Sequence, residues 1–241
     1  SSRWQASEGP EIIYRNGYYY LFLAYGTLSV EYNTRVCRSA NIDGPYVDID
    51  GNSAMGNSEL YPILTAPYKF NNSYGWVGIS HCGIFDDGED NWYYASQGRF
   101  PVNVGGNEYS NAIMMGHVRS IRWDANGWPL VMPERYGAVP QVPITEAEIA
   151  GDWEHLALTT NTGNQKTSET MTYNLSTHKI TSGSWKSATW TFDEATQTIT
   201  TSTGVVLYLQ REVDWETTPR THTIVYAAHG TQKTYWGKKI H

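Results

Sequence analysis

The chain has 241 residues, a net charge of −7 and a sequence pI of about 5.5. Its 10 Trp, 18 Tyr and 5 Phe exclude an intrinsically disordered chain, because such chains lack aromatic residues. The acidic balance lacks the basic footprint of a nucleic-acid-binding protein, and no run approaches the about 20 apolar residues that cross a bilayer. The two cysteines, Cys37 and Cys82, are too far apart for a CxxC metal clamp and too few for a disulfide framework.

The chain opens Ser1-Ser2-Arg3-Trp4, with no Met and no signal peptide. This start fits a secreted protein that has lost its signal, and it fits a fragment of a longer chain equally well.

Strand signals dominate the first half. Two β-rich runs within residues 11–26 meet at Asn16-Gly17, a dipeptide that predicts a tight hairpin because both turn positions need positive φ. A similar aromatic run recurs at residues 92–94, and each copy is followed by a third expected strand, 34–39 and 112–122. Recurring multi-strand units indicate propeller blades, although any two antiparallel hairpins share this pattern.

The second half changes in composition. Another hairpin is expected over residues 121–131, and Gly and Pro then punctuate a linker near 137–150 that ends in a short helical turn at 145–149. Residues 151–241 are rich in Thr and show eight short β segments. These segments are 153–160, 168–175, 178–182, 184–193, 197–201, 204–212, 221–228 and 232–239. Such closely spaced antiparallel strands predict a small closed barrel.

Several runs occur in an order that resembles one known family. Glu8-Gly9-Pro10 directly precedes the aromatic hairpin. It is followed by Tyr32-Asn33-Thr34-Arg35-Val36, Gly127-Trp128-Pro129, Gly151-Asp152-Trp153-Glu154 and Tyr235-Trp236-Gly237. The chain resembles the C-terminal half of endo-1,5-α-L-arabinanases of glycoside hydrolase family 43, in the long subgroup with an appended C-terminal barrel. The resemblance implies an all-β fold: residues 1–140 as about two blades of a five-bladed β-propeller, and residues 141–241 as a lipocalin-like β-barrel.

The resemblance implies that Glu8 is the catalytic general acid. Cleavage of a glycosidic bond needs a proton on the leaving oxygen, and a carboxyl group can supply it if its surroundings keep it protonated. The alternative is a solvated acid in a frayed N-terminus. An inverting enzyme also needs a second carboxylate about 6.5–9.5 Å away.

No Asp of this chain matches the family's base or its orienting Asp, which lie upstream of the Glu. Asp43, Asp86, Asp87 and Asp90 are therefore given no catalytic role, and Asp48 and Asp50 are expected to be solvated turn residues. The resemblance thus implies a partner: an N-terminal propeller segment on a separate or missing chain.

His81 is the second candidate. The resemblance implies that it helps to hold a central metal ion, usually calcium, mostly through waters; the alternative is a lone His with backbone partners. Ser80 and Cys82 stand where the family tends to have Gly and Asn. A Cys82–His81 nucleophilic pair is disfavoured, because adjacent strand residues point to opposite faces. Cys37 is expected to be a small buried filler.

Substrate contacts are implied for Arg99, Tyr32 and Asn33, although a surface Arg is an equal reading of Arg99. In the second domain, Trp153, Trp185, Trp190, Trp215 and Trp236 either form a carbohydrate-binding face or, as we favour, fill the barrel and its seam.

The resulting hypothesis is an inverting hydrolase of α-1,5-linked arabinan, endo-acting, bound to calcium, and secreted or periplasmic because its substrate is a plant polymer. Two alternatives stay open. One is an exo-acting arabinofuranosidase or xylosidase of the same family. The other is a non-catalytic carbohydrate-binding propeller protein, which the single catalytic carboxylate favours.

Overall fold

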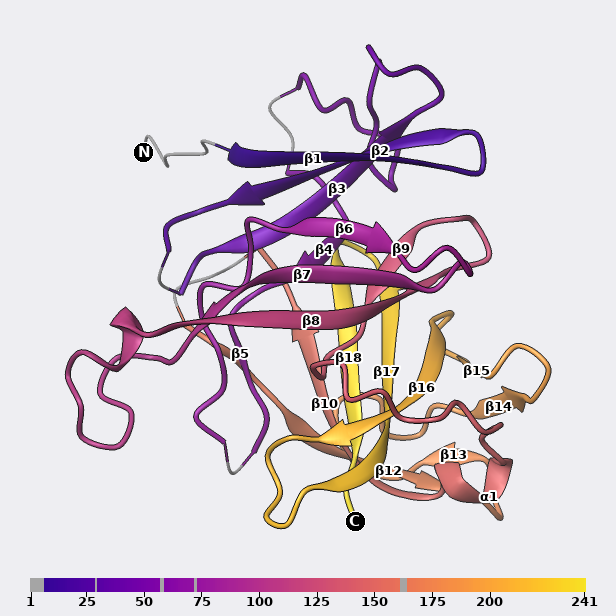
Figure 1. Ribbon diagram of the computed structural model, residues 1–241. Helices are drawn as coiled ribbons and strands as arrows, with labels where there is room; N and C mark the ends of the chain where they lie inside the picture. The colour runs from indigo at the N-terminus through magenta and orange to yellow at the C-terminus, as the bar shows by residue number, and fades with distance from the viewer. Residues whose placement is uncertain (1–6, 29, 57–58, 72, 161–163) are drawn as a thin grey trace.

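The computed structural model describes residues 7–28, 30–56, 59–71, 73–160 and 164–241, and they are nearly all β (Figure 1). The opening segment Ser1–Trp4 lies outside the described residues. Within the described part of the chain, no helix is long and apolar enough to cross a membrane.

The first sheet is a four-stranded antiparallel blade. Its order is β1 (Ser7–Arg15), β2 (Tyr18–Tyr25), β3 (Asn33–Ser39) and β4 (Ile63–Thr65). The hairpin expected at Asn16-Gly17 is confirmed, and both residues have positive φ, 48° and 88°. Alternate residues of β2, including Tyr20 and Phe22, are buried, which fixes the register of the sheet.

The second sheet repeats this plan, as the recurring aromatic run indicated. Its order is β6 (Gly83–Asp86), β7 (Trp92–Arg99), β8 (Met114–Trp123) and β9 (Pro129–Val131), with a short 3₁₀ turn, η1 (Ser110–Ala112), before β8. The two sheets lie side by side in Figure 1 and are joined at their first strands. The N–H of Ile84 donates to Glu11 Oε1, and Arg15 pairs with Asp90 at 3.0 Å.

The second half forms an eight-stranded sheet that is a nearly closed barrel. Its order is β13 (Lys179–Ile180), β12 (Glu169–Asn174), β10 (Gly151–Leu158), β18 (Lys233–Lys239), β17 (Thr221–Gly230), β16 (Val206–Asp214), β15 (Thr198–Thr201) and β14 (Trp190–Asp193). A bridge between Lys179 and Thr189 connects the two outer strands. The eight expected segments each contain one of these strands or overlap it.

Short elements attach the barrel to the blades. The expected helical turn is α1 (Glu146–Ile149), which Thr145 and Glu148 close with a capping box. Strand β5 (Tyr68–Lys69), from the blade side, pairs in parallel with β11 (Lys166–Thr167).

Two hydrophobic cores result. One fills the barrel and contains Trp153, Trp185 and Trp190. The other runs through both blades and onto the barrel strands β10, β17 and β18, where Trp236 donates its indole N–H to the Val131 carbonyl at 2.8 Å. These tryptophans are buried, as expected for structural support, and Trp215 donates to the Arg135 carbonyl.

One expectation is wrong. Asp48 is not a solvated turn residue, because it is 2% exposed. Its carboxylate accepts the backbone N–H groups of Asp50, Asn52 and Tyr61 and so holds the loop between β3 and β4. An Asp in a polar turn can serve as an internal acceptor, and sequence pattern does not separate this case from solvation.

Candidate active site

Glu8 lies at an irregularity in the first strand. The pairing of β1 with β2 is Glu8 with Ala24 and then shifts to Glu11 with Phe22. Gly9 takes a φ of +57° at this bulge, which re-aims the preceding side chain. The side chain of Glu8 is 60% exposed at the edge of the sheet.

Three expected site residues meet at this edge. The Tyr32 hydroxyl donates to Glu8 Oε1 at 2.6 Å and lies 3.3 Å from His81 Nδ1. The same His81 nitrogen lies 4.0 Å from Glu8 Oε1. Tyr32 itself is buried, so a fixed ring presents its hydroxyl to two more exposed partners.

The Glu-Gly-Pro run has a geometric reason at its middle residue. A Cβ on Gly9 would lie 2.8 Å from His81 Cδ2, closer than real contacts allow. Only glycine therefore lets the imidazole lie against the strand that carries Glu8. His81 also has positive φ, 58°, in the loop that leads into β6.

The protons of this group can be assigned from its donors and acceptors. Tyr32 has a single hydroxyl proton; because it donates that proton to Glu8 Oε1, its oxygen can only accept at the contact with His81 Nδ1. A neutral imidazole that donates from Nδ1 in this contact would keep its Nε2 lone pair for a ligand. Burial and the hydrogen bond to Glu8 raise the pKa of Tyr32 well above its usual value, so it stays a donor at neutral pH.

A buried hydroxyl network supports the site, and sequence reasoning missed it. Ser80 donates to the Asn33 carbonyl at 3.0 Å, and its hydroxyl lies 2.7 Å from that of Thr34. Thr34 in turn lies 2.7 Å from the Tyr94 hydroxyl, so the loop that carries His81 is fixed to both blades. The only sequence signal was Ser80 itself, which stands where the family tends to have Gly.

The remaining expected substrate residues differ in their surroundings. Arg99 packs over Gly78, at the start of the His81 loop, and donates to the Asn111 carbonyl at 3.3 Å. Its backbone pairs with Val77, which places it beside the loop that carries His81. Asn33 is buried, and its amide is used internally: it donates to the Glu31 carbonyl and accepts from Arg35 Nε.

Other reactive groups are unsuited to the site. Burial raises the pKa of both Cys37 and Cys82 to about 12, so neither thiol is a ready nucleophile. Asp90 pairs with Arg15 at the far end of β1 from Glu8. At about 3.3 Å per strand residue, that end is on the order of 20 Å away.

Among the described residues, donors for a metal ion occur in more than one place. His81 offers one nitrogen beside Glu8, which fits a single protein ligand of a mainly water-coordinated ion. The group of three acids whose oxygens lie close enough to share an ion is elsewhere: Glu134, Asp214 and Glu216. There the ammonium of Lys238 already contacts all three, at 3.2, 3.0 and 2.6 Å, and also approaches Glu154. We call these five residues the Lys238 cluster.

Comparisons with known proteins agree with this architecture. Residues 1–129 match Glycosyl hydrolases family 43, and residues 133–237 match a C-terminal lipocalin-like domain. The extracellular endo-α-(1→5)-L-arabinanase 2 of Bacillus subtilis is 30% identical over 169 residues, which are 61% of this chain and 34% of that protein. An extracellular endo-α-(1→5)-L-arabinanase of Thermotoga petrophila is 30% identical over 171 residues, 62% of this chain and 34% of that one.

The solved structure of an endo-1,5-α-L-arabinanase from Thermotoga petrophila has the same fold, with a TM-score of 0.82 at 24% identity. The likeness covers 98% of this chain and 56% of that one, so the chain spans about half of that structure. With more than half of its residues matched by the family, the chain belongs to glycosyl hydrolase family 43.

Proposed function

We propose that this chain carries the general acid of an enzyme that hydrolyses the α-1,5-L-arabinofuranosidic bonds of arabinan with inversion. The relatives that it resembles in sequence are named endo-α-(1→5)-L-arabinanases. The observation that carries the proposal is the contact of 2.6 Å between the Tyr32 hydroxyl and Glu8 Oε1, at an exposed edge of the first blade.

Glu8 is the proton donor in this mechanism. An acid must reach the leaving glycosidic oxygen, and Glu8 is the carboxylic acid of the Tyr32–His81 group, with more than half of its side chain accessible. The Tyr32 hydroxyl orients it by holding one carboxylate oxygen, which leaves the other free to face the sugar. Glu8 lies in the part of the chain that matches the family, and its contact with Tyr32 supports this role.

The catalytic base is proposed to lie outside this chain. Inversion needs a second carboxylate about 6.5–9.5 Å from the acid, with room for a water between them. No Asp of this sequence matches the family's base, which the resemblance places upstream of Glu8. An N-terminal propeller segment, on a separate chain or missing from this one, would supply this group.

We further propose that His81 Nε2 binds a divalent ion, with calcium the first choice. A bound cation supplies positive charge beneath the substrate and steadies the nearby carboxylates. Within this chain, a hydrogen bond from His81 Nδ1 to Tyr32 would leave Nε2 open to the ion, and Gly9 leaves room for the imidazole.

Arg99 and Tyr32 are proposed to contact the sugar, because Tyr32 contacts Glu8 and Arg99 lies beside the loop that carries His81. Asn33 fits a supporting role better, since its amide already bonds within the chain. Export from the cytoplasm is proposed on the names of the relatives, which are called extracellular.

Glu8→Gln in the intact protein tests the assignment. Loss of a general acid costs about 10²- to 10⁴-fold in rate, so the release of reducing ends from linear arabinan should fall by at least 100-fold while binding is retained. Glu89→Gln, in an exposed turn between β6 and β7, is the matched control and should act like the wild type. Unchanged turnover in Glu8→Gln would remove Glu8 from the mechanism.

One rival function is a carbohydrate-binding protein without catalysis, which is favoured because no Asp of this sequence matches the family's base. The wild-type protein decides between them: a binder retains linear arabinan and releases no sugar. Product analysis separates the exo-acting alternative, which releases one short product from the start, from an endo-acting enzyme, which first gives a ladder of lengths.

A further inference from the structure

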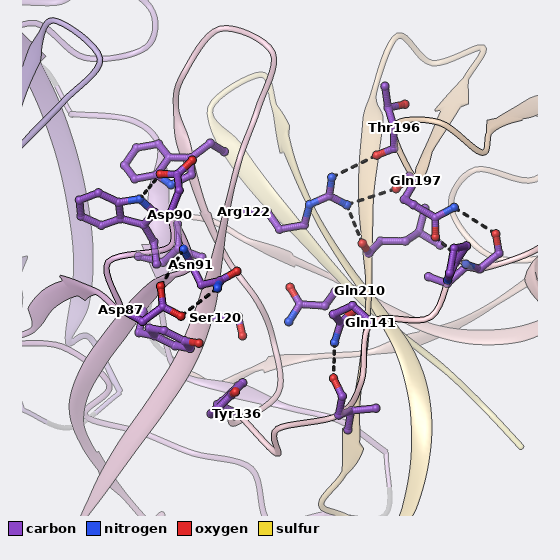
Figure 2. A pocket seen from close by; sticks show the side chains of 18 of the residues that line it. Asp87, Asp90, Asn91, Ser120, Arg122, Tyr136, Gln141, Thr196, Gln197 and Gln210 are labelled. Atoms are coloured by element: carbon purple, nitrogen blue, oxygen red, sulfur yellow. Dashed lines mark hydrogen bonds between the residues drawn. The ribbon is translucent and has the colours of Figure 1, made fainter.

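A cleft of about 690 Å³ lies where the second blade meets the barrel, away from Glu8 (Figure 2). One wall comes from the β6–β7 turn and from β8, with Asn91 and Ser120. The other comes from the linker before α1 and from β16, with Gln210. The volume falls within the about 300–1,000 Å³ of sites that hold small ligands.

The charged groups of this cleft already have partners within the fold. Arg15 pairs with Asp90 at 3.0 Å and lies over the Trp123 ring. Arg122 donates to the carbonyls of Leu209, at 2.6 Å, and Thr196, at 3.1 Å, and so ties the blade to the barrel.

Asp87, the other acid of the lining, accepts the backbone N–H groups of Glu89 and Asn91 and the Asn91 side-chain amide. A charged ligand would therefore have to displace bonds that the fold already makes.

What remains available in the cleft is neutral. Within the described part of the chain, no hydrogen bond is made by the side chains of Gln210 and Ser120 or by Asn91 Oδ1, although the Asn91 amide nitrogen is bound to Asp87. The amide of Gln210 points across the opening toward the blade in Figure 2. Tyr136, 41% exposed, packs edge-on against Tyr93 with ring centroids 5.1 Å apart and offers an aromatic surface at the rim.

We infer that this cleft binds a neutral, polyhydroxylated ligand, a stretch of the arabinan chain, at a second site that performs no hydrolysis. Amide and hydroxyl groups can donate to and accept from sugar hydroxyls, and a tyrosine ring can cover the apolar face of a pentose while its own hydroxyl stays wet. The identity of the sugar rests on the proposed function, whereas the preference for an uncharged saccharide rests on the cleft alone.

The position of the cleft relative to Glu8 suggests how binding there would assist hydrolysis. Arg15, which lines it, is at the opposite end of β1 from Glu8. One polymer chain held at this end is kept near the protein, which raises its effective concentration at the Glu8 site. Short oligosaccharides that cannot reach both sites gain nothing from it.

The test uses the intact protein in a Glu8→Gln background, which stops hydrolysis, and the combined change of Tyr136→Ala with Gln210→Ala. Calorimetric titration with linear arabinan should show at least fivefold weaker binding than in the background, while Tyr74→Ala, at an exposed tyrosine outside the cleft, should have no effect. In the protein that retains Glu8, the same pair of changes should raise KM for linear arabinan and leave KM for arabinotriose unchanged.

The outcomes separate this site from the proposed function. Unchanged binding of linear arabinan by the doubly substituted protein would overturn the second site even if Glu8 proves catalytic. A second possible result is that the wild type does not bind linear arabinan but binds linear xylan, and that the two substitutions abolish the binding of xylan. This result would support the saccharide-binding cleft and would contradict the assignment of arabinan as its ligand. Binding of neither polymer overturns the proposal.

Discussion

The Glu8 site and the Lys238 cluster both contain several ionisable residues, but these residues are exposed at the first and buried in the second. At the Glu8 site the carboxylate and the imidazole are 60% and 57% exposed, on top of buried neutral hydroxyls. In the Lys238 cluster an ammonium group that is 2% exposed lies among four carboxylates between the blades and the barrel.

The pKa shifts of the cluster show that its ionisable groups interact strongly with one another. Burial alone would lower the pKa of Lys238, but the acids around it, Glu134 and Glu216 foremost, hold it above its ordinary value. Burial and the charge of Glu216 raise the pKa of Glu134, whereas the hydrogen bond from Glu134 and the charge of Lys238 outweigh burial and lower the pKa of Glu216. The cluster is thus closed to ligands, whereas the Glu8 site is open to them.

This difference shows that a high local number of acidic residues does not by itself mark a site for catalysis. The acids with metal-like spacing already hold an internal cation and join two parts of the fold. The single acid at the bulge has one fixed oxygen and open space in front of it. Changes in the cluster should therefore affect stability, and changes around Glu8 should affect turnover.

Lys238→Met gives the largest expected effect on stability. Removal of one partner from a buried charge network leaves the others unpaired and costs about 3–5 kcal/mol in the free energy of unfolding. Urea denaturation measures this loss, and Lys233→Met, on the same strand at a more exposed position, should cost well under 1 kcal/mol. A loss in Lys238→Met no larger than in the control would show that the cluster contributes nothing net.

Glu212→Gln should change how stability depends on pH. Burial raises the pKa of Glu212 to about 7, while Oε1 accepts the N–H groups of Gly137 and Val213. Because the folded-state pKa lies above the unfolded value near 4.5, the stability that the neutral acid contributes is present below pH 4.5 and is lost as the pH rises to 7. The loss reaches at most about 3 kcal/mol.

Urea unfolding at pH 5 and pH 8 measures this dependence. Glu212→Gln should lack that part of the decline, and Glu194→Gln, at an exposed barrel turn, should keep it. An equal decline in wild type and Glu212→Gln would mean that the buried acid ionises as it does in the unfolded chain.

Local signals predicted much of the fold. Asn16-Gly17 specifies its own turn, and Thr-rich segments separated by turn residues specify the barrel strands, because both depend on neighbours in sequence. The start of one strand was predicted less accurately. The strand expected at residues 112–122 is β8, which begins at Met114 because Ser110–Ala112 forms a 3₁₀ turn.

The site was predicted only in part, for a physical reason. Family motifs named Glu8, Tyr32 and His81, which the structure brings into contact. The support beneath them, from Ser80 and Tyr94, depends on which residues of distant strands face the same interior. The members of the Lys238 cluster likewise have the sequence pattern of solvent-exposed charged residues. They come together only because the barrel packs against the blades.

The smallest expected change in stability comes from Gly9→Ala and Gly17→Ala, and comparing these two variants distinguishes backbone strain from an effect on the Glu8 site. Gly9→Ala and Gly17→Ala both place a Cβ at positive φ, +57° and +88°, so each should cost about 1–2 kcal/mol. Nothing lies within 4 Å of a Cβ at Gly17, but the one at Gly9 would strike the His81 ring. Gly9→Ala should therefore also lower turnover of linear arabinan, about tenfold or more, while Gly17→Ala leaves turnover intact below its melting temperature. Equal turnover in the two variants would show that the contact between His81 and the strand of Glu8 does not matter to the reaction.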